Sequence, residues 1–305
     1  MNISAKIKEY DAWPEISYSE LKPTLYLLHR MIQMLGKVKL SSPFEPHWSN
    51  VILLPTSGGI TTGAIPYKSG VFDAFFDTVE HKIVFNSSWG KKSAFELSPL
   101  SVAETYTKFL NCLKEIEVEI SINPMPQEVA DAISFEKDSE SRPYDRALVN
   151  AWWRILISSY GVLEKYHARF NGISPSVGLM WGTLDLRDAR IKNCPVFPLK
   201  KNIIERNAYD VHQFEAGFWA GDEEYPKPAY FSFMHPLPPN IEQAKIKPEF
   251  AGWNNEMGEF IVDYEDIRKA QNPEEALLAF FESSYEVSAD ASGWNPKLIG
   301  SGKPI

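Results

Sequence analysis

The distribution of apolar residues along the chain predicts helices that alternate with β-rich segments. In residues 19–35, apolar side chains recur at alternating spacings of three and four, which places them on one face of an amphipathic helix. Ser19 is the expected N-cap of this helix, and Gly36 fits its end. Residues 48–97 instead form short apolar runs separated by turn residues, which predicts an antiparallel meander.

The rest of the chain contains further helix signals and a second group of strands. Ser101 and Glu104 form a capping box that starts a helix, and a second long helix is expected over residues 144–170. Asn272 and Pro273 are the expected N-cap and first residue of a helix near the end of the chain. Before that helix we expect strands over residues 177–186, 212–219, 229–233 and 259–262.

This order of elements predicts an α+β fold, with antiparallel sheets covered by helices in a single unit over residues 1–305. Residues 19–143 and 174–290 both read as strands followed by a capped helix, and the helix over 144–170 joins them. Two interpretations stay open. The halves are the product of a duplication, or they show what any two α+β layers look like.

Composition narrows the function classes. The net charge is −9, which argues against nucleic acid and anionic membranes as partners. No apolar run approaches the roughly 18 residues that span a bilayer, and the first residues lack the apolar core of a signal peptide. The chain has two cysteines, Cys112 and Cys194, which form no CxxC pair and no disulfide framework. Such cysteine usage is typical of proteins in a reducing compartment. We therefore expect a cytoplasmic protein, while the sequence does not indicate its oligomeric state.

The common enzyme signatures are absent from the sequence. It contains no HExxH, no GxSxG, no Walker A loop and no GxGxxG after a strand. No two of its histidines stand four residues apart, the spacing of a helical zinc site. We expect no cofactor and no native metal, and the motifs leave open whether the protein is an enzyme.

Two polar clusters lie in the first half of the chain. His29 and its neighbours Tyr26 and Arg30 flank the apolar stripe of the first helix, where they form either the edge of a pocket or an ordinary solvated helix face. His47 and Trp48 precede the first strand. This pair suits ligand stacking and hydrogen bonding, and it equally suits a tryptophan that anchors the sheet edge.

A third cluster lies in the predicted strand over residues 177–186, whose alternation places Trp181, Thr183 and Asp185 on one face. An aspartate in an apolar strand must be paired or face a cavity, because burying an unpaired carboxylate is costly. If the later strands are neighbours, Asp185 meets three more polar residues over an aromatic floor: Arg190, His212 and Glu215. Alternatively, Asp185 and Arg190 form a structural pair and the tryptophans are ordinary core.

The leading hypothesis is a small-molecule-binding protein with an aromatic-lined pocket. The predicted ligand-binding residues are His29, His47, Trp48, Trp181, Asp185, Arg190, Tyr209, His212 and Trp219. One alternative is a hydrolase or transferase that uses Asp185 and a nearby histidine as an acid/base pair. Another alternative is a protein-interaction module that uses exposed aromatic side chains.

Several short motifs, spread over almost the whole chain, carry a resemblance to a known family. They include His47-Trp48, Trp181-Gly182 with Asp185-Leu186, and Gly217-Phe218-Trp219. Taken together, these motifs resemble those of a family of uncharacterised bacterial proteins, which is classified as a domain of unknown function. The match covers the full-length protein and not a single module. The resemblance therefore implies no activity.

The chain departs from the family pattern at two positions. The pattern has a histidine where Gly178 stands here. It also has a His-Glu pair ahead of Gly-Phe-Trp, where this sequence has Val211-His212, so that the histidine is displaced by one residue. Because a one-residue shift on a strand moves a side chain to the opposite face, we expect that this member has lost or remodelled the family's site.

Overall fold

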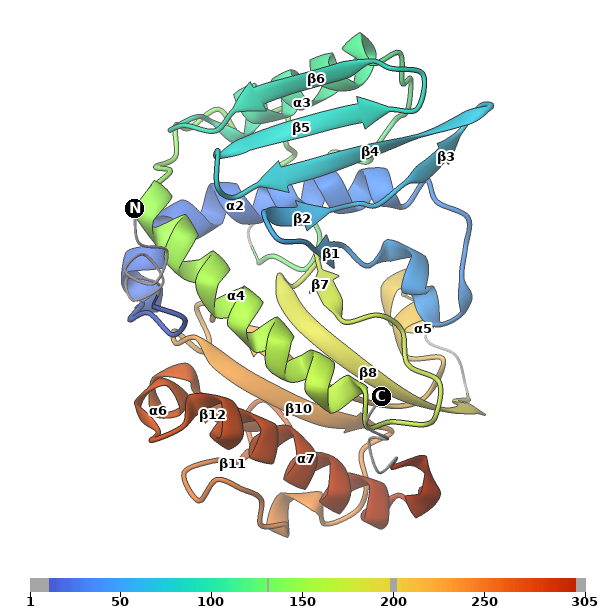
Figure 1. The fold of residues 1–305 in the computed structure, drawn as a ribbon, viewed down its shortest axis with the longest axis vertical. Coiled ribbons are helices and arrows are strands. Elements are labelled where there is room, and N and C mark those ends of the chain that lie inside the picture. Colours follow the sequence, from blue (N-terminus) through green and yellow to red (C-terminus); the bar gives the residue numbers. More distant parts are fainter. Residues whose placement is uncertain (1–10, 131, 198–201, 300–305) are drawn as a thin grey trace, which may run out of the picture.

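Two antiparallel sheets of six strands each are stacked along the long axis of the molecule (Figure 1). The structure is a computed structural model, and it describes residues 11–130, 132–197 and 202–299. The first residues of the chain, used above to argue against a signal peptide, lie outside these ranges. Helices and antiparallel strands together confirm the α+β class.

The N-terminal sheet is the predicted meander. Its strands pair in the order β1-β2-β4-β5-β6, and β3 pairs with β4. The capping box at Ser101 and Glu104 is formed on both sides, and the helix that it opens, α3 (Val102–Glu115), packs on β5 and β6. The strands are β1 (Leu54–Pro55), β2 (Gly59–Thr61), β3 (Ile65–Tyr67), β4 (Gly70–Asp77), β5 (Lys82–Ser87) and β6 (Lys92–Glu96).

The C-terminal sheet has the strand order β11-β12-β10-β9-β8-β7, and all its neighbours are antiparallel. Its strands are β7 (Gly178–Met180), β8 (Asp185–Pro195), β9 (Val211–Trp219), β10 (Ala229–His235), β11 (Gly252–Asn254) and β12 (Glu259–Asp263). An isolated antiparallel bridge between Leu53 and Leu179 joins the two sheets. The duplication hypothesis stays a prediction.

Three long helices organise the molecule. Helix α2 (Tyr18–Lys39) passes beside the N-terminal sheet, and α4 (Arg146–His167) and α7 (Pro273–Ala291) contact the C-terminal sheet (Figure 1). The N-cap and the C-terminal end predicted for the first helix were wrong. Ser17 is the N-cap, and the helix continues through Gly36. The remaining helical segments are η1 (Pro46–Val51), α5 (Ile203–Ala208), η2 (Ile241–Gln243), α6 (Tyr264–Lys269) and η3 (Pro296–Leu298).

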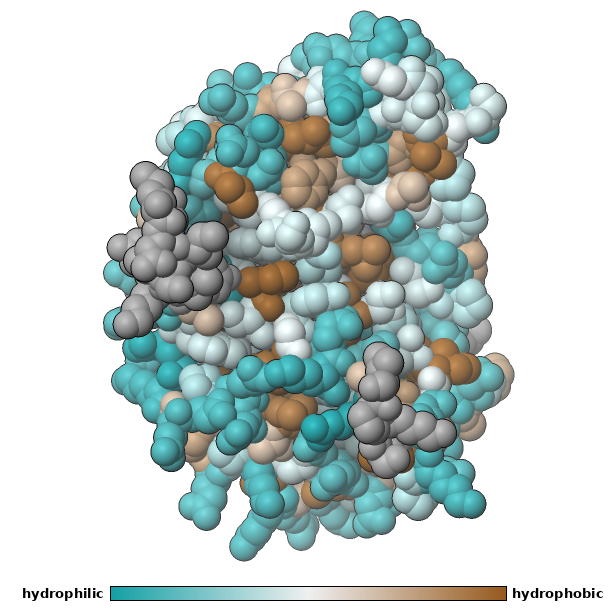
Figure 2. All heavy atoms as spheres, viewed as in Figure 1, coloured by the Kyte–Doolittle hydropathy of each residue, from teal (hydrophilic) through white to brown (hydrophobic). Residues whose placement is uncertain are grey.

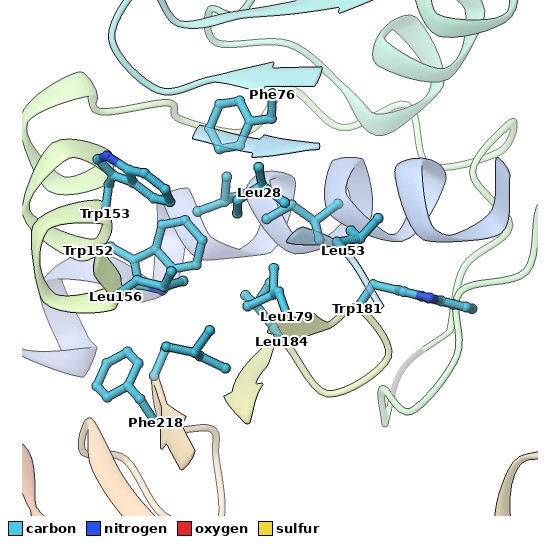
Figure 3. Close-up of a cluster of buried hydrophobic side chains, with 14 of the residues drawn as sticks. Leu28, Leu53, Phe76, Trp152, Trp153, Leu156, Leu179, Trp181, Leu184 and Phe218 are labelled. Carbon is cyan, nitrogen blue, oxygen red and sulfur yellow. The ribbon is translucent and has the colours of Figure 1, made fainter. Parts of the chain in front are cut away.

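One continuous core connects both halves. Figure 3 shows side chains of α2, α4 and both sheets meeting between the layers, with Leu28, Phe76, Trp152 and Phe218 among them. Burial of this shared apolar surface makes the halves depend on each other for stability. None of the helices within the described ranges combines the length and apolar character needed to cross a membrane.

Candidate functional site

A cavity of about 870 Å³ lies against one face of the C-terminal sheet. Its walls come from α2, η1, α5, a segment over residues 127–130 and the turn between β7 and β8. This volume lies within the usual range of small-molecule pockets, about 300–1,000 Å³. The lining combines tryptophan, tyrosine and phenylalanine rings with several carboxylates.

Strand alternation decides which residues reach the cavity. On β8, Asp185 and Arg187 share the cavity face, and on β9 Glu215 and Trp219 do so. Leu186 of β8 and Phe214, Ala216 and Phe218 of β9 point to the opposite face, where Phe214 contacts Tyr285 of α7. One face of the sheet therefore belongs to the core, and the other face belongs to the cavity.

The strand predicted over residues 177–186 is instead a hairpin. β7 ends at Met180, residues 181–184 form a turn, and Leu184 has a left-handed backbone conformation with φ of 63°. Trp181 and Thr183 therefore reach the cavity from the turn and not from a shared strand face with Asp185. The Thr183 hydroxyl donates a hydrogen bond to Asp185 Oδ1.

An ion pair occupies the base of the cavity. Nη1 of Arg187 lies 3.0 Å from Oε1 of Glu215, and both residues are 7% exposed. Gln213 also lies on this face of β9, and its Nε2 donates to the same Glu215 oxygen at 2.7 Å. The carboxylate of Glu215 is thus held by a cation and an amide.

Of the other carboxylates that line the cavity, three have a raised pKa. Burial and the nearby Glu215 raise the pKa of Asp185 well above its usual range. The same two causes raise the pKa of Glu259 to about 7. Burial also raises the pKa of Glu128. The raised pKa of each of these groups means that its ionised form is disfavoured where it lies.

Helix α2 supplies the opposite wall and fixes the segment that carries Glu128. Gln33 accepts a hydrogen bond from the backbone N–H of Gln127 and donates to its carbonyl oxygen, at 2.8 and 2.7 Å. His29 Nε2 lies 2.9 Å from the carbonyl oxygen of Gly182. A carbonyl oxygen only accepts, so Nε2 carries the proton and Nδ1 is left as an acceptor. Burial, with Arg30 nearby, lowers the pKa of His29 to about 4, so the ring is neutral at pH 7.

Gly36 explains why the helix does not end where the sequence suggests. A Cβ atom at this position would overlap the indole ring of Trp181. The glycine therefore serves close packing inside the helix, which is a use of glycine distinct from a C-cap. Trp181 belongs to the hairpin turn, is 4% exposed and packs its ring against α2 at Gly36.

Six of the nine predicted ligand-binding residues line the cavity: His29, Trp48, Trp181, Asp185, Tyr209 and Trp219. Their positions agree with a shared pocket, and their role in binding stays a prediction. The remaining three, His47, Arg190 and His212, are not among the lining residues.

Arg190 was wrongly expected near Asp185. It lies on the opposite face of β8, because a separation of five residues on a continuous strand reverses the side. Its guanidinium lies 3.5 Å from the ring centre of Tyr166 and 4.2 Å from that of Tyr285, and Nη2 donates to the Tyr166 carbonyl oxygen at 2.7 Å. The proposed structural pair with Asp185 is equally wrong.

Backbone geometry keeps both His212 and His47 out of the cavity lining. His212 lies on the same face of β9 as Phe214, whereas the neighbouring Gln213 occupies the cavity side. His47 has a left-handed backbone with φ of 59°, and its Nδ1 lies 4.0 Å from Asp210 Oδ1. Only its neighbour Trp48 reaches the cavity.

Arg187, Glu259 and Glu128 were not predicted as site residues from the sequence, and Glu215 was expected only as a neighbour of Asp185. The spacing of Asp185 and Arg187, two residues apart on a strand, was the available signal for a shared face. Nothing in the sequence pairs Glu259 or Glu128 with this strand. Within the described ranges, no three His, Cys, Asp or Glu side chains are arranged to hold a metal ion.

Fold and site together describe an α+β protein with an aromatic and acidic cavity on one face of its second sheet. A family model, described as a family of unknown function (DUF5996), matches residues 13–301, and the chain belongs to this family. This match confirms the resemblance drawn from the short motifs. Neither a curated protein nor a solved structure matches the chain.

Proposed function

We propose that this protein binds a small organic molecule in the cavity. The observation that carries the proposal is the convergence of aromatic rings and buried polar groups on a single space of about 870 Å³. The α7 side of the same sheet is filled mainly by apolar and aromatic side chains, and Arg190, which is also buried there, is enclosed by the rings of Tyr166 and Tyr285 and faces no cavity.

The enzyme alternative lacks a supporting contact. Among the described residues, the histidine that lines the cavity is His29, and its Nε2 is occupied by backbone carbonyl groups. A neutral ring with a pKa of about 4 is poorly matched to proton transfer at neutral pH. The geometry therefore favours binding over acid/base chemistry by Asp185 and a histidine.

The interaction-module alternative has no continuous apolar surface on the face in Figure 2. Hydrophobic residues there are scattered among hydrophilic ones. Scattered apolar residues are normal on a protein surface and do not indicate a partner.

We also propose that the protein is bacterial and works in the cytoplasm, without nucleic acid or membrane partners. The bacterial origin rests on the resemblance described above. The free thiols of Cys112 and Cys194 suit a reducing compartment. The negative charge gives no field for phosphate-rich partners.

The proposal is tested by a thermal-shift screen of the purified protein against a library of metabolites. Trp219→Ala removes a cavity ring, and Trp89→Ala is the matched control, because Trp89 lies in the turn between β5 and β6, outside the cavity lining, and its Nε1 donates to the Ile116 carbonyl oxygen. We expect compounds that raise the melting temperature of the wild type and of Trp89→Ala, but not of Trp219→Ala. A screen without any such compound would contradict the proposal.

A further inference from the structure

The charges that line the cavity are unbalanced. Among the described residues seven carboxylates line it, and the cationic side chains there are Lys22, Arg30 and Arg187. The seven are Glu128, Asp185, Glu215, Asp222, Glu223, Glu224 and Glu259. This excess is local to one cavity and is not a consequence of the net charge alone.

The cations are already engaged. Lys22 Nζ lies 2.6 Å from Glu223 Oε1, and Arg187 is paired with Glu215. Arg30 stacks on Tyr26, with its guanidinium carbon 3.8 Å from the ring centre. None of these contacts neutralises Asp185, Glu128 or Glu259.

Three carboxylates are therefore left for a ligand. Within the described part of the chain, the side chains of Glu128 and Glu259 form no hydrogen bond or ion pair. Asp185 is 8% exposed, and the hydrogen bond that its side chain accepts comes from the neutral Thr183 hydroxyl. Asp185 is buried, Glu259 is half-buried and Glu128 is exposed at the cavity wall, so the cost of an unpaired charge falls mainly on Asp185, and a bound cation would lower it.

The other lining groups suit the same ligand. Trp48, Tyr209 and Trp219 present aromatic rings, whose faces attract cations. His29, which is neutral at pH 7, also lines the cavity. The carboxylates are not grouped closely enough to coordinate a single metal ion, which favours an organic cation with its charge and its apolar surface spread over several contacts.

We propose that the ligand is an organic ammonium ion, seated between the aromatic rings and the carboxylates of Asp185, Glu128 and Glu259. This inference rests on the proposed binding function and specifies its substrate class. Binding also displaces protons, because a cation favours the ionised form of each carboxyl group whose pKa burial raises. The charged and titratable groups that face Asp185 and Glu259 are Glu128, Glu215, Arg187 and Tyr209.

Isothermal titration of the full chain with choline, agmatine and spermidine tests the inference. The neutral control is 3,3-dimethylbutan-1-ol, which has the shape of choline without its charge. We expect at least one of the three cations to bind. If choline binds, the neutral alcohol should bind about tenfold more weakly or not at all. Titration at pH 7 in phosphate and in HEPES should give different heats, because released protons are taken up by the buffer and neither buffer carries a net positive charge.

Variants separate this inference from the proposed function. Glu259→Gln and Asp185→Asn keep the shape of the cavity, and each should weaken cation binding by about tenfold or more. If none of the three cations binds while neutral or anionic compounds from the thermal-shift screen do, the cation inference is overturned and the binding function stands. If no compound of either experiment binds, both fail.

Discussion

Arg187 and Glu215 form an ion pair between neighbouring strands, and it lies on the cavity face of the sheet and not in the apolar core. Substitution of Arg187 and substitution of Glu215 leave different charges in the cavity. Loss of Arg187 leaves Glu215 without its ion-pair partner and also removes the positive charge that partly offsets the raised pKa of Asp185, whereas loss of the Glu215 charge removes a repulsion on Asp185 and leaves Arg187 in the same field.

We therefore predict an asymmetry between two variants. Arg187→Met should lower the free energy of unfolding by about 3–5 kcal/mol, the usual cost of breaking a buried pair. Glu215→Gln keeps an acceptor for Gln213 and should cost about 1 kcal/mol or less. Urea denaturation of both variants beside the wild type measures the difference, and equal losses would count against the assigned charge arrangement.

A second prediction concerns Gly36, where a methyl group would overlap the Trp181 ring. Gly36→Ala should destabilise the protein by about 1–3 kcal/mol through overpacking. Gly161→Ala is the matched control. Gly161 is also helical, but a Cβ atom there meets nothing within 4 Å, so alanine should stabilise by about 0.5–1 kcal/mol. Thermal melts that move in the same direction for both variants would show that the packing argument is wrong.

A third prediction uses the contact between His167 and Asp188, whose Nδ1 and Oδ1 atoms lie 2.5 Å apart. The hydrogen bond to Asp188 raises the pKa of His167 above its unfolded value of about 6.5. A raised histidine pKa stabilises the fold fully below the unfolded pKa, and this stability is lost as pH rises through the folded pKa. His167→Asn should therefore cost more stability at pH 5.5 than at pH 8.5, measured as the urea midpoint.

His212 provides the contrast, because burial and the nearby Lys192 lower its pKa. In the wild type, stability falls at low pH as the unfolded chain binds the proton more readily. His212→Asn removes this penalty, so it should gain stability relative to the wild type at pH 5.5 and show little difference at pH 8.5. The same pH trend in both histidine variants would refute the two assignments.

Much of the fold could be predicted because its signals are local. The capping box at Ser101 and Glu104, the meander over residues 48–97 and the helix after Asn272 depend on neighbouring residues and on side-chain periodicity. Gly36 was misread because its reason is a contact with Trp181, which is distant in sequence.

The site was harder to predict because it depends on which strands are neighbours. Alternation on a continuous strand puts Arg190 and Asp185 on opposite faces, and β8 pairs with β9 without a register shift from Leu186 to Ile191. Glu259 comes from β12, which β9 and β10 separate from β8. No local pattern reveals a strand order of this kind, so the carboxylates could not be assembled from the sequence.

The central claim is that the cavity retains Asp185 for a ligand at a cost to stability. Burial and Glu215 raise the pKa of Asp185 in the folded state, so stability falls as pH rises from the unfolded pKa of about 4 through the folded value. Asp185→Asn removes this penalty and keeps an acceptor for Thr183. The matched control is Asp138→Asn. Asp138 is 3% exposed, accepts the Tyr26 hydroxyl at 2.7 Å and is paired with Arg142.

The most direct measurement is the melting temperature of these two variants and the wild type at pH 5 and pH 8, without ligand. Asp185→Asn should melt at or above the wild-type temperature, by a margin that is larger at pH 8. Asp138→Asn should melt below the wild type, because it loses about 1–3 kcal/mol of structural contacts. A large drop for Asp185→Asn at pH 8, comparable to that of Asp138→Asn, would show that Asp185 is structural and would contradict the account.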